Sequence, residues 1–405
     1  MFRKKGKKRR MPDEFQVKYD EFGPELIYAV HDAKVGMRGF LVLDNTALGL
    51  GKGGIRMTPS VSIGEVSKLA RTMTWKNAIA ELPFGGAKAG IILDDRKVSA
   101  EQKQKVMAAF ARALRPICPS RYVAGPDMNT GEQEMKTFAE ANGNWHASTG
   151  KPANYCMKFM KHEKGEKCGI PHEFGSTGFG VYHATKVAAA FAGLDMKKAT
   201  FAVEGFGNVG TFLAKYLSKE AKFIAVSDSR GVLYNKDGID YEKLMGVKEQ
   251  KGTVTAYGGG GSQVLPDSKK ILDIPADILI TAAMPNLILK EDVQRIKAKM
   301  IVEGSNIPAT EEVEKAMTAR KILVVPDFVA NAGGVISSYA EYKGHNPKHM
   351  FELVEGKIVR NTQLILAGAK SAGISPRDAA MKIAIARVRK AMDAREKRMG
   401  KRNGT

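Results

Sequence analysis

Two lysines in the first half of the chain stand among small residues, where an anion could reach their amines. Lys52 lies in the segment GKGG and Lys88 in the segment GGAKAG. A lysine that loses water when a site closes can serve in acid–base or electrostatic roles near neutral pH. Taken alone, each lysine is more simply explained as a surface loop residue, so its chemistry depends on what accompanies it.

A third lysine, Lys76, falls on an apolar stripe of the helix expected over residues 63–82. The stripe is made by residues at helical spacing, namely Val66, Leu69, Met73 and Ala80. A lysine there must be buried, paired or directed into a cleft. It could equally extend its amine to water from the edge of the stripe, and the pattern favours neither alternative.

Asp127 is the carboxylate that could work beside these lysines. It lies in GPDMNTGEQ, just before a helix expected over 131–141. Thr130 and Gln133 fit a T-x-x-Q capping box for that helix, which leaves Asp127 without a capping role. A carboxylate near cationic lysines can carry protons, although a plain salt bridge explains it too.

The second half contains a complete G-x-G-x-x-G motif after an expected strand at 200–204. Its residues are Gly205, Phe206, Gly207, Asn208, Val209 and Gly210. Such glycines allow a tight turn and close approach to a pyrophosphate, and the helix that follows offers amide donors. Asp228 ends the next strand, 23 residues after the first glycine, where an acid binds the adenosine ribose. A dinucleotide half preceded by three lysines predicts a site for a dicarboxylate anion.

The residues around Asp228 bear on the choice between NAD and NADP. Asp228 favours NAD because its charge repels a 2′-phosphate, whereas the adjacent Ser229 and Arg230 could accommodate that group. We expect NAD to be slightly favoured, with NADP as the alternative.

The elements that must position these residues differ between the two halves. The first half mixes helices with strands at 37–44 and 87–94. In the second half, apolar strands alternate with helices, which is typical of a parallel sheet covered on both faces. We expect an α/β protein with an N-terminal α/β domain and a Rossmann-like, doubly wound dinucleotide-binding domain, with the cleft between them. The boundaries expected are 14–174 with C-terminal helices of 343–405, and 175–342.

The charge balance is strongly basic. The net charge is +21, and seven positive charges fall in the first ten residues. We expect residues 1–13 to form a basic, disordered arm. Such a surplus attracts anions, but no aromatic residues are interleaved with the charges as in a nucleic-acid stacking platform, so nucleic acid is not an expected partner.

The apolar segments and the cysteines indicate in which cellular compartment the protein is expected. No run approaches the roughly 20 apolar residues that span a bilayer, and the N-terminus lacks the apolar stretch of a secretory signal. The three cysteines, Cys118, Cys156 and Cys168, predict a reducing compartment without a disulfide framework, hence a cytoplasmic protein. Cys156, Cys168, His162 and His172 crowd one segment, but their spacing matches no standard zinc pattern, so no metal site is expected.

Several segments in order carry a family resemblance over about residues 25–345. They are GKGGIRM, MTWKNAIAELPFGGAKAGI, AGPDMNTGEQEM, GSTGFGV, VEGFGNVG, VSDSRG, VEGSN and PDFVANAGGVISS. Together they resemble the glutamate/leucine/phenylalanine/valine dehydrogenase family. The resemblance implies NAD(P)-dependent oxidative deamination of an amino acid. It also implies an N-terminal domain that binds substrate and holds subunits together, and a homo-hexamer.

The resemblance also implies roles for individual residues. Lys88 matches the lysine that activates the water attacking an imine carbon, Asp127 the aspartate that shuttles protons, and Lys76 the lysine that binds the substrate α-carboxylate. The cofactor-contacting positions are Thr177, Asn208 and Asn306, and the nicotinamide side of the cleft is lined by Asn331, Gly333 and Val335, the last against the substrate.

Substrate identity depends on two positions. Lys52 and Ser338 match the pair that binds the side-chain carboxylate of glutamate, which implies glutamate, 2-oxoglutarate and ammonium as substrates. Branched-chain enzymes carry apolar residues at both, and a charged lysine is costly to bury against leucine. A branched-chain amino-acid dehydrogenase is the alternative, and an inactive, nucleic-acid-binding relative is a more distant one.

The sequence departs from the family pattern at several points. The turn DNTALGLGKGG is more like that of the leucine enzymes, and GGAKAG replaces the commoner GGGKGG. Asp95 and Phe179 replace residues usual in the family, and the segment 154–174 looks longer than usual. These departures bear on substrate identity more than on reaction type.

Overall fold

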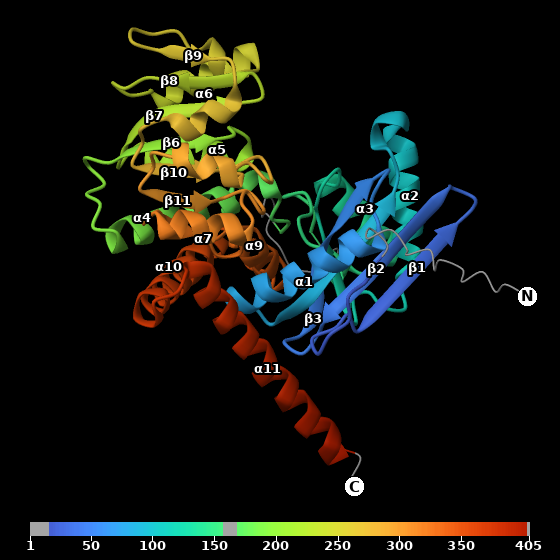
Figure 1. The fold of residues 1–405 in the computed structure, drawn as a ribbon. Helices are drawn as coiled ribbons and strands as arrows, with labels where there is room; N and C mark the ends of the chain where they lie inside the picture. Colours follow the sequence, from blue (N-terminus) through green and yellow to red (C-terminus); the bar gives the residue numbers. More distant parts are fainter. Residues whose placement is uncertain (1–15, 157–167, 403–405) are drawn as a thin grey trace, which may run out of the picture. The chain divides into compact units, whose positions relative to one another are not determined.

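The computed structural model describes residues 16–156 and 168–402, which divide into two units (Figure 1). The first unit contains residues 16–77, 83–156, 168–169 and 391–402, and the second contains residues 78–82 and 170–390. Each unit has its own sheet. The predicted two-domain α/β architecture is therefore confirmed.

The first unit contains a five-stranded sheet of order β1-β2-β4-β3-β5. Its strands are β1 (Leu26–Asp32), β2 (Met37–Asn45), β3 (Leu50–Thr58), β4 (Phe84–Ile92) and β5 (Tyr122–Gly125). β2 is antiparallel to β1 and β4, whereas β3 is parallel to both β4 and β5. The parallel β4-β3-β5 part brings the ends of three strands to one edge of the sheet.

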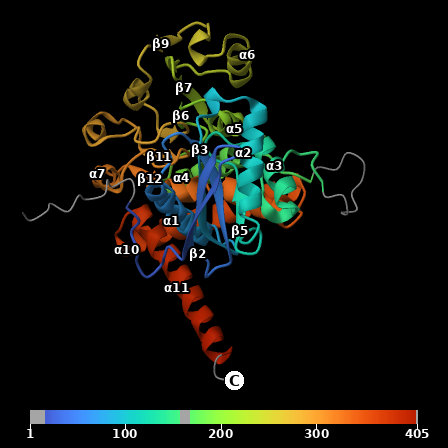
Figure 2. The ribbon, with the colours of Figure 1, turned by 90° about the vertical axis from the view of Figure 1, so that its right-hand side faces the viewer.

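Helices cover both faces of this sheet. They are α1 (Ile63–Ile79), α2 (Ala100–Ala113) and α3 (Glu132–Asn142). Alternate residues of β2 enter different cores: Leu41 and Leu43 pack with α2 and α3, whereas Phe40 and Val42 pack with α1. In Figure 2, α1 and the α2–α3 pair flank the sheet on opposite sides.

The second unit contains a seven-stranded sheet of order β12-β11-β10-β6-β7-β8-β9. Its strands are β6 (Thr200–Glu204), β7 (Lys222–Asp228), β8 (Gly231–Tyr234), β9 (Gln263–Leu265), β10 (Ile278–Thr281), β11 (Met300–Glu303) and β12 (Leu323–Val325). The strands from β12 to β7 are parallel, and β8 and β9 are antiparallel. The chain leaves β6 toward β7 on one side and returns to β10 on the other, so the strand order reverses beside β6.

The helices of this unit include those that join its parallel strands. They are α4 (Ser176–Phe191), α5 (Asn208–Leu217), α6 (Tyr241–Lys251), α7 (Glu311–Ala319), α8 (Asp327–Ala330), α9 (Gly333–Tyr342), α10 (Pro347–Ala372) and α11 (Pro376–Arg402).

Both units also contain short 3₁₀ helices, at Asp95–Lys97, Trp145–Ala147, His172–Phe174, Val254–Ala256, Ser268–Asp273 and Lys290–Arg295. None of the helices in the described ranges is both long and apolar enough to cross a membrane.

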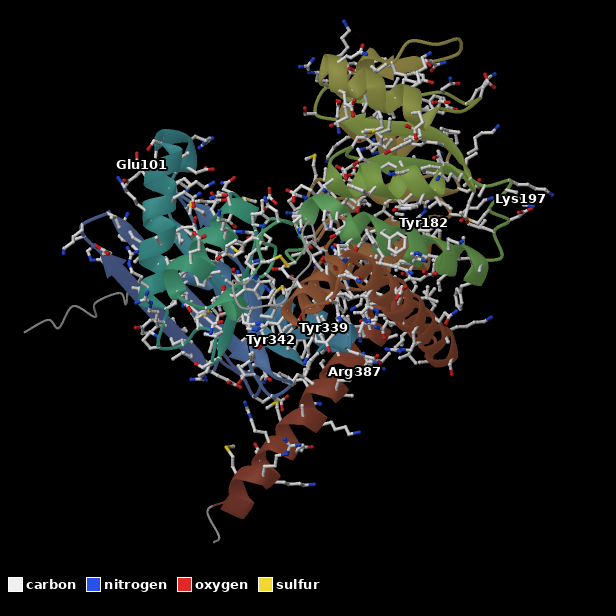
Figure 3. The ribbon with its side chains drawn as sticks, turned by 180° about the vertical axis from the view of Figure 1, so that it is seen from behind. Glu101, Tyr182, Lys197, Tyr339, Tyr342 and Arg387 are labelled. Carbon is white, nitrogen blue, oxygen red and sulfur yellow. A yellow bond between two sulfur atoms is a disulfide. The ribbon has the colours of Figure 1, made fainter. Side chains whose placement is uncertain are left out.

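The C-terminal helices were predicted to join the first domain, but α10 and the first part of α11 lie in the second unit. The buried side of α10, which includes Val354, Ile358 and Leu366, packs on α4 and α9. Arg387 of α11, labelled in Figure 3, donates hydrogen bonds to the Ala78 and Ile79 carbonyls. Only the end of α11 belongs to the first unit, where Arg395 pairs with Glu25.

The prediction about the cysteines was wrong for two of them. Cys156 and Cys168 form a disulfide, and Cys118 is a free, buried thiol. Bonded sulfurs are not available to zinc, and His162 lies outside the described residues. Within the described ranges, no three potential ligand side chains cluster in a way that could hold a metal ion.

A buried charge cluster joins the start of α11 to the sheet of the second unit. Arg377 lies 3.2 Å from Glu303 at the end of β11, 2.5 Å from Glu314 of α7 and 2.9 Å from Asp327 of α8. All three carboxylates are buried. Burial, together with the charges of Glu314 and Asp327, holds the pKa of Glu303 well above its usual range, against the effect of Arg377. One arginine therefore compensates several buried acids.

We predict that Arg377→Met lowers the free energy of unfolding by about 3–5 kcal/mol, because it leaves the acids without a cation. Denaturant unfolding at equal protein concentration measures the loss. Arg395→Met, at a half-exposed ion pair on the same helix, should cost less than about 1 kcal/mol. Equal losses for the two variants would contradict a special role for Arg377.

Candidate active site

Lys88 and Asp127 form an ion pair in the first unit. The Lys88 Nζ lies 2.9 Å from Oδ1 of Asp127, and Lys88 is only 6% exposed. Lys88 comes from β4, and Asp127 from the loop after β5. A Cβ on Gly54 of β3 would lie 2.8 Å from the Cβ of Asp127, so glycine is needed there for the loop to approach. The pair is close enough for direct proton transfer as well as for electrostatic attraction.

Thr130 positions Asp127 and does not cap the next helix. Its hydroxyl accepts a hydrogen bond from the Asp127 amide at 2.9 Å and donates one to the Ile55 carbonyl at 2.7 Å. The predicted Thr130–Gln133 capping box is therefore wrong. Helix α3 begins after Gly131, whose amide donates to the Glu134 carboxylate. Thr130 instead ties the Asp127 loop to β3.

Arg56 is a site residue that sequence reasoning missed. Its Nε lies 2.8 Å from Oδ2 of Asp127, and its Nη1 lies 2.5 Å from Glu65 of α1. Burial alone would raise the pKa of Asp127, but the charges of Lys88 and Arg56 outweigh it and lower that pKa to about 2. Residues 52, 54 and 56 share one face of β3, but this alternation is a signal only where a strand is expected, and glycine and lysine in GKGG are typical of loops.

Lys52 is buried in β3, paired in register with Gly86 of β4 and Val123 of β5. Its Nζ donates a hydrogen bond to the Ala124 carbonyl at 2.7 Å. An ideal Cβ on Gly125 would lie 2.5 Å from this amine. Lys52 and Lys88 thus lie on neighbouring strands that only small residues allow to pack so closely.

Lys76 is half-buried on α1, but the predicted stripe around it was wrong in detail. The buried residues of α1 include Val66, Ser67, Ala70, Thr74 and Asn77. Leu69 and Met73 are only half-buried and lie on the side of the helix that carries Lys76. Thr74 donates to Asp44, and Asn77 to the Gly85 carbonyl, so the buried side of α1 includes polar side chains that the predicted stripe did not contain.

In the second unit, the turn after β6 has the geometry expected of a dinucleotide-binding motif. Gly205 has φ +84°, and a Cβ there would lie 2.4 Å from the Cβ of Ala283. A Cβ on Gly210 would lie 2.1 Å from the Gly205 carbonyl oxygen, whereas one on Gly207 would meet open space. Gly207 is the N-cap of α5, which starts at Asn208 and Val209. The open side of Gly207 is thus where a pyrophosphate can approach the helix N-terminus.

Glu204 fixes this turn to the strand on the other side of the topological reversal. Its buried carboxylate accepts hydrogen bonds from the amides of Ala282, Ala283 and Met284, at 3.0 to 3.1 Å. Burial nevertheless raises the pKa of Glu204 above its ordinary value, against these hydrogen bonds. The loops after β6 and β10 are thereby held at a set spacing.

Asp228 ends β7 and is half-buried, while Ser229 and Arg230 beside it are exposed. Its Oδ1 accepts from the Arg230 amide at 2.8 Å. Its Oδ2 accepts from the Thr253 hydroxyl at 2.7 Å and from the Val254 amide at 2.8 Å. Asp228 therefore also anchors the 253–254 loop, a contact between distant segments that no local pattern indicated.

Asn331 connects the end of α8 to the loop after β11. Its Nδ2 donates to Oδ1 of Asn306 at 3.0 Å and lies within 3.4 Å of the Gly304 and Ser305 carbonyls. Among the described residues, Oδ1 of Asn331 and Oδ1 of Asn208 are buried oxygens with no hydrogen-bond partner. Amide oxygens left in this way fit a ligand that brings its own N–H or O–H donors, as a nicotinamide dinucleotide does.

The remaining predicted residues also belong to the second unit. Thr177 is buried near the start of α4, and Val335 and Ser338 are half-buried on α9. The structure thus brings Lys88 and Asp127 into contact and places Lys52 one strand away. Ser338 belongs to the second unit and Lys52 to the first.

Two family models match the chain. The model "Glu/Leu/Phe/Val dehydrogenase, dimerisation domain" matches residues 24–143, and "Glutamate/Leucine/Phenylalanine/Valine dehydrogenase" matches residues 168–396. The two matches together cover most of both units.

Similar proteins are glutamate dehydrogenases by name. The enzyme of Thermotoga maritima is 40% identical over 314 residues, 75% of this chain and 72% of that protein. The NADP-specific enzyme of Saccharolobus shibatae is 35% identical over 87% of this chain and 83% of that protein. The hetero-hexameric glutamate dehydrogenase of Thermus thermophilus, solved in its Leu-bound form, is 25% identical with a TM-score of 0.78 and covers 92% of this chain and 90% of its own.

We predict that Gly207→Ala weakens cofactor binding at least about tenfold without unfolding the protein, because the new methyl group enters only the open side of the turn. Fluorescence titration with NADH or NADPH and thermal unfolding measure the two effects. Gly205→Ala is the control that should lose stability, because its positive φ and Ala283 leave no room for a side chain. Unchanged affinity in Gly207→Ala would contradict a dinucleotide at this turn.

Proposed function

The chain belongs to the glutamate/leucine/phenylalanine/valine dehydrogenase family, and on that premise we propose that it is a glutamate dehydrogenase. It converts L-glutamate, NAD(P)⁺ and water to 2-oxoglutarate, ammonium, NAD(P)H and a proton, and it also runs in reverse. The observation that carries the proposal is the contact of buried Lys88 with partly buried Asp127 in one unit of a protein whose other unit has a dinucleotide-binding turn.

The cofactor supplies the acceptor for the hydride that leaves the substrate Cα. The protein residues then manage water and protons. Lys88 first gives its ammonium proton to Asp127, which lies within hydrogen-bond reach at 2.9 Å, and then accepts a proton from the water that attacks the imine carbon. Asp127 gives its proton to the nitrogen that leaves as ammonia, which returns both residues to their starting charges. Lys76 binds the substrate α-carboxylate in this scheme.

Glutamate is favoured over a branched-chain substrate by Lys52. A buried ammonium group beside the Ala124 carbonyl is better compensated by an anionic side chain than by an isobutyl group. Ser338 is the proposed second contact to that carboxylate, and Val335 lies one helical turn before it on α9.

The cofactor choice follows from the end of β7. Asp228 supports a slight preference for NAD, with Ser229 and Arg230 as the residues that would admit the 2′-phosphate of NADP. Asn306, Asn331 and Thr177 are proposed contacts to the nicotinamide half.

A homo-hexamer is the proposed assembly, with the first unit forming subunit contacts. It is supported by the dimerisation-domain match and by the hexameric Thermus thermophilus enzyme. A cytoplasmic location is also proposed. The free thiol of Cys118 is compatible with it. The Cys156–Cys168 disulfide does not contradict it, because some intracellular proteins, those of hyperthermophiles, contain disulfides.

We predict that kcat/KM for glutamate exceeds that for leucine at least about tenfold, and that Lys52→Leu removes most of this preference by losing the charge that holds the side-chain carboxylate. Initial rates of NADH and NADPH formation with both amino acids measure it and give the cofactor preference. Lys105→Leu, at an exposed lysine, is the control and should keep the preference. Faster turnover of leucine by the unaltered protein would contradict the proposed substrate.

A further inference from the structure

The ion pair of Lys88 and Asp127 is the inner end of a longer chain of alternating charges. Glu65 of α1 contacts Arg56 of β3, Arg56 contacts Asp127, and Asp127 contacts Lys88 of β4. Lys88 and Asp127 take part in the proposed proton transfers, whereas Arg56 and Glu65 have no role in them so far. We propose that Arg56 is a positioning residue that orients the Asp127 carboxylate toward Lys88, and that Glu65 anchors Arg56. This inference rests on the proposed function.

The geometry supports this role because the two carboxylate oxygens are divided between two cations. Oδ1 faces the Lys88 amine at 2.9 Å, and Oδ2 faces the Arg56 Nε at 2.8 Å. With Oδ2 held, Oδ1 is the oxygen left for proton exchange with Lys88. Arg56 makes one hydrogen bond to Asp127, from Nε, and one to Glu65, from Nη1, so the rigid guanidinium sets the directions of the two contacts relative to each other. A lysine ammonium has no such fixed geometry.

Glu65 completes the arrangement from the opposite side. The Nη1 of Arg56 lies 2.5 Å from Oε1 of Glu65, so the guanidinium contacts two acids at once. The side chains of Arg56 and Asp127 are each 18% exposed, whereas that of Glu65 is 39% exposed. Glu65 is therefore the end of the chain that water reaches most easily, and the inner contacts are the less screened ones.

Arg56 also affects the protonation of Asp127. The groups that face this carboxylate are Lys88 from β4, Arg56 from β3, with Glu65 of α1 behind it, and Tyr122 from β5. Burial raises the pKa of Tyr122 well above its usual range, and the charge of Asp127 adds to that rise, so Tyr122 is neutral. Removing Arg56 takes away one of the two cations, Lys88 and Arg56, whose charges oppose the effect of burial, so the pKa of Asp127 must then rise from about 2.

The test compares Arg56→Gln with Arg56→Lys and Glu65→Ala. Arg56→Gln should lower kcat for glutamate by about 10- to 100-fold with a change in KM below about threefold, and move the acid limb of the kcat/KM profile to higher pH. Arg56→Lys should bring the acid limb of the kcat/KM profile part of the way back to its original pH but should not restore kcat. Lysine supplies the positive charge without the fixed geometry of the guanidinium group. Glu65→Ala should have a smaller effect in the same direction.

Arg96→Gln is the matched control, because Arg96 pairs with Asp94 on the surface, and it should leave rate and profile unchanged. A purely structural role for Arg56 would lower stability and leave the pH limb in place, which would overturn the proposal. So would full activity in Arg56→Gln.

A second measurement separates this inference from the proposed function. The pKa of Asp127 is lowered on folding, so its contribution to stability is present above the ordinary value of 3.8 and is lost as the pH falls through about 2. The melting-temperature difference between the unaltered protein and Arg56→Gln should therefore shrink between pH 5 and 2. This holds even if glutamate is not the substrate. A difference independent of pH would contradict the role of Arg56 at Asp127.

Discussion

The contact on which the first unit depends is the one between the Lys88 amine and the Asp127 carboxylate. Both groups are largely removed from water, and burial of either charge alone would be costly. Their pairing requires β3, β4 and the loop after β5 to approach closely, so the strands carry glycines and alanines there. At Gly53, for example, a Cβ would lie 1.6 Å from the Ala87 carbonyl oxygen. The segment GKGG is thus part of a strand, β3, in which small residues leave room for Lys52 and for Lys88 of the neighbouring strand.

In the second unit, backbone donors and amide oxygens are left available to a dinucleotide. Buried acids elsewhere in the unit keep its loops at a fixed spacing. Glu204 holds the loop after β10 against the turn after β6. Asp327 contributes in a similar way, because its carboxylate accepts from the amide of Ile307, a non-glycine residue with φ +50°, next to Asn306. Arg377 compensates that acid from the start of α11. Charges far apart in the sequence therefore set the positions of the residues proposed to bind the cofactor.

The features of the protein that could be predicted from its sequence are those determined by local patterns. The G-x-G-x-x-G motif, its flanking strand and helix, and Asp228 at the next strand end all follow from short-range spacing, and the structure places them accordingly. Strand β3 was not predicted, because glycine and lysine in GKGG are typical of loops. It is a strand because β4 and β5 lie on either side of it.

The contacts that sequence could not give are those between distant segments. Arg56 meets Asp127 across 71 residues, and the Thr253 hydroxyl meets Asp228 across 25. The error at Thr130 has a related cause: the T-x-x-Q pattern was locally sound, but the Ile55 carbonyl of β3 and the Asp127 amide occupied the hydroxyl instead. Tertiary hydrogen bonds overrode a local preference of modest energy.

The claim that Lys88 and Asp127 work as one unit is tested most directly by a double-mutant cycle in kcat/KM for glutamate. Lys88→Gln and Asp127→Asn should each lower it by about 10²- to 10⁴-fold, and the double variant should be little worse than the worse single variant, because either change already breaks the proton path. Losses that multiply in the double variant, or a single variant that keeps its rate, would contradict the account.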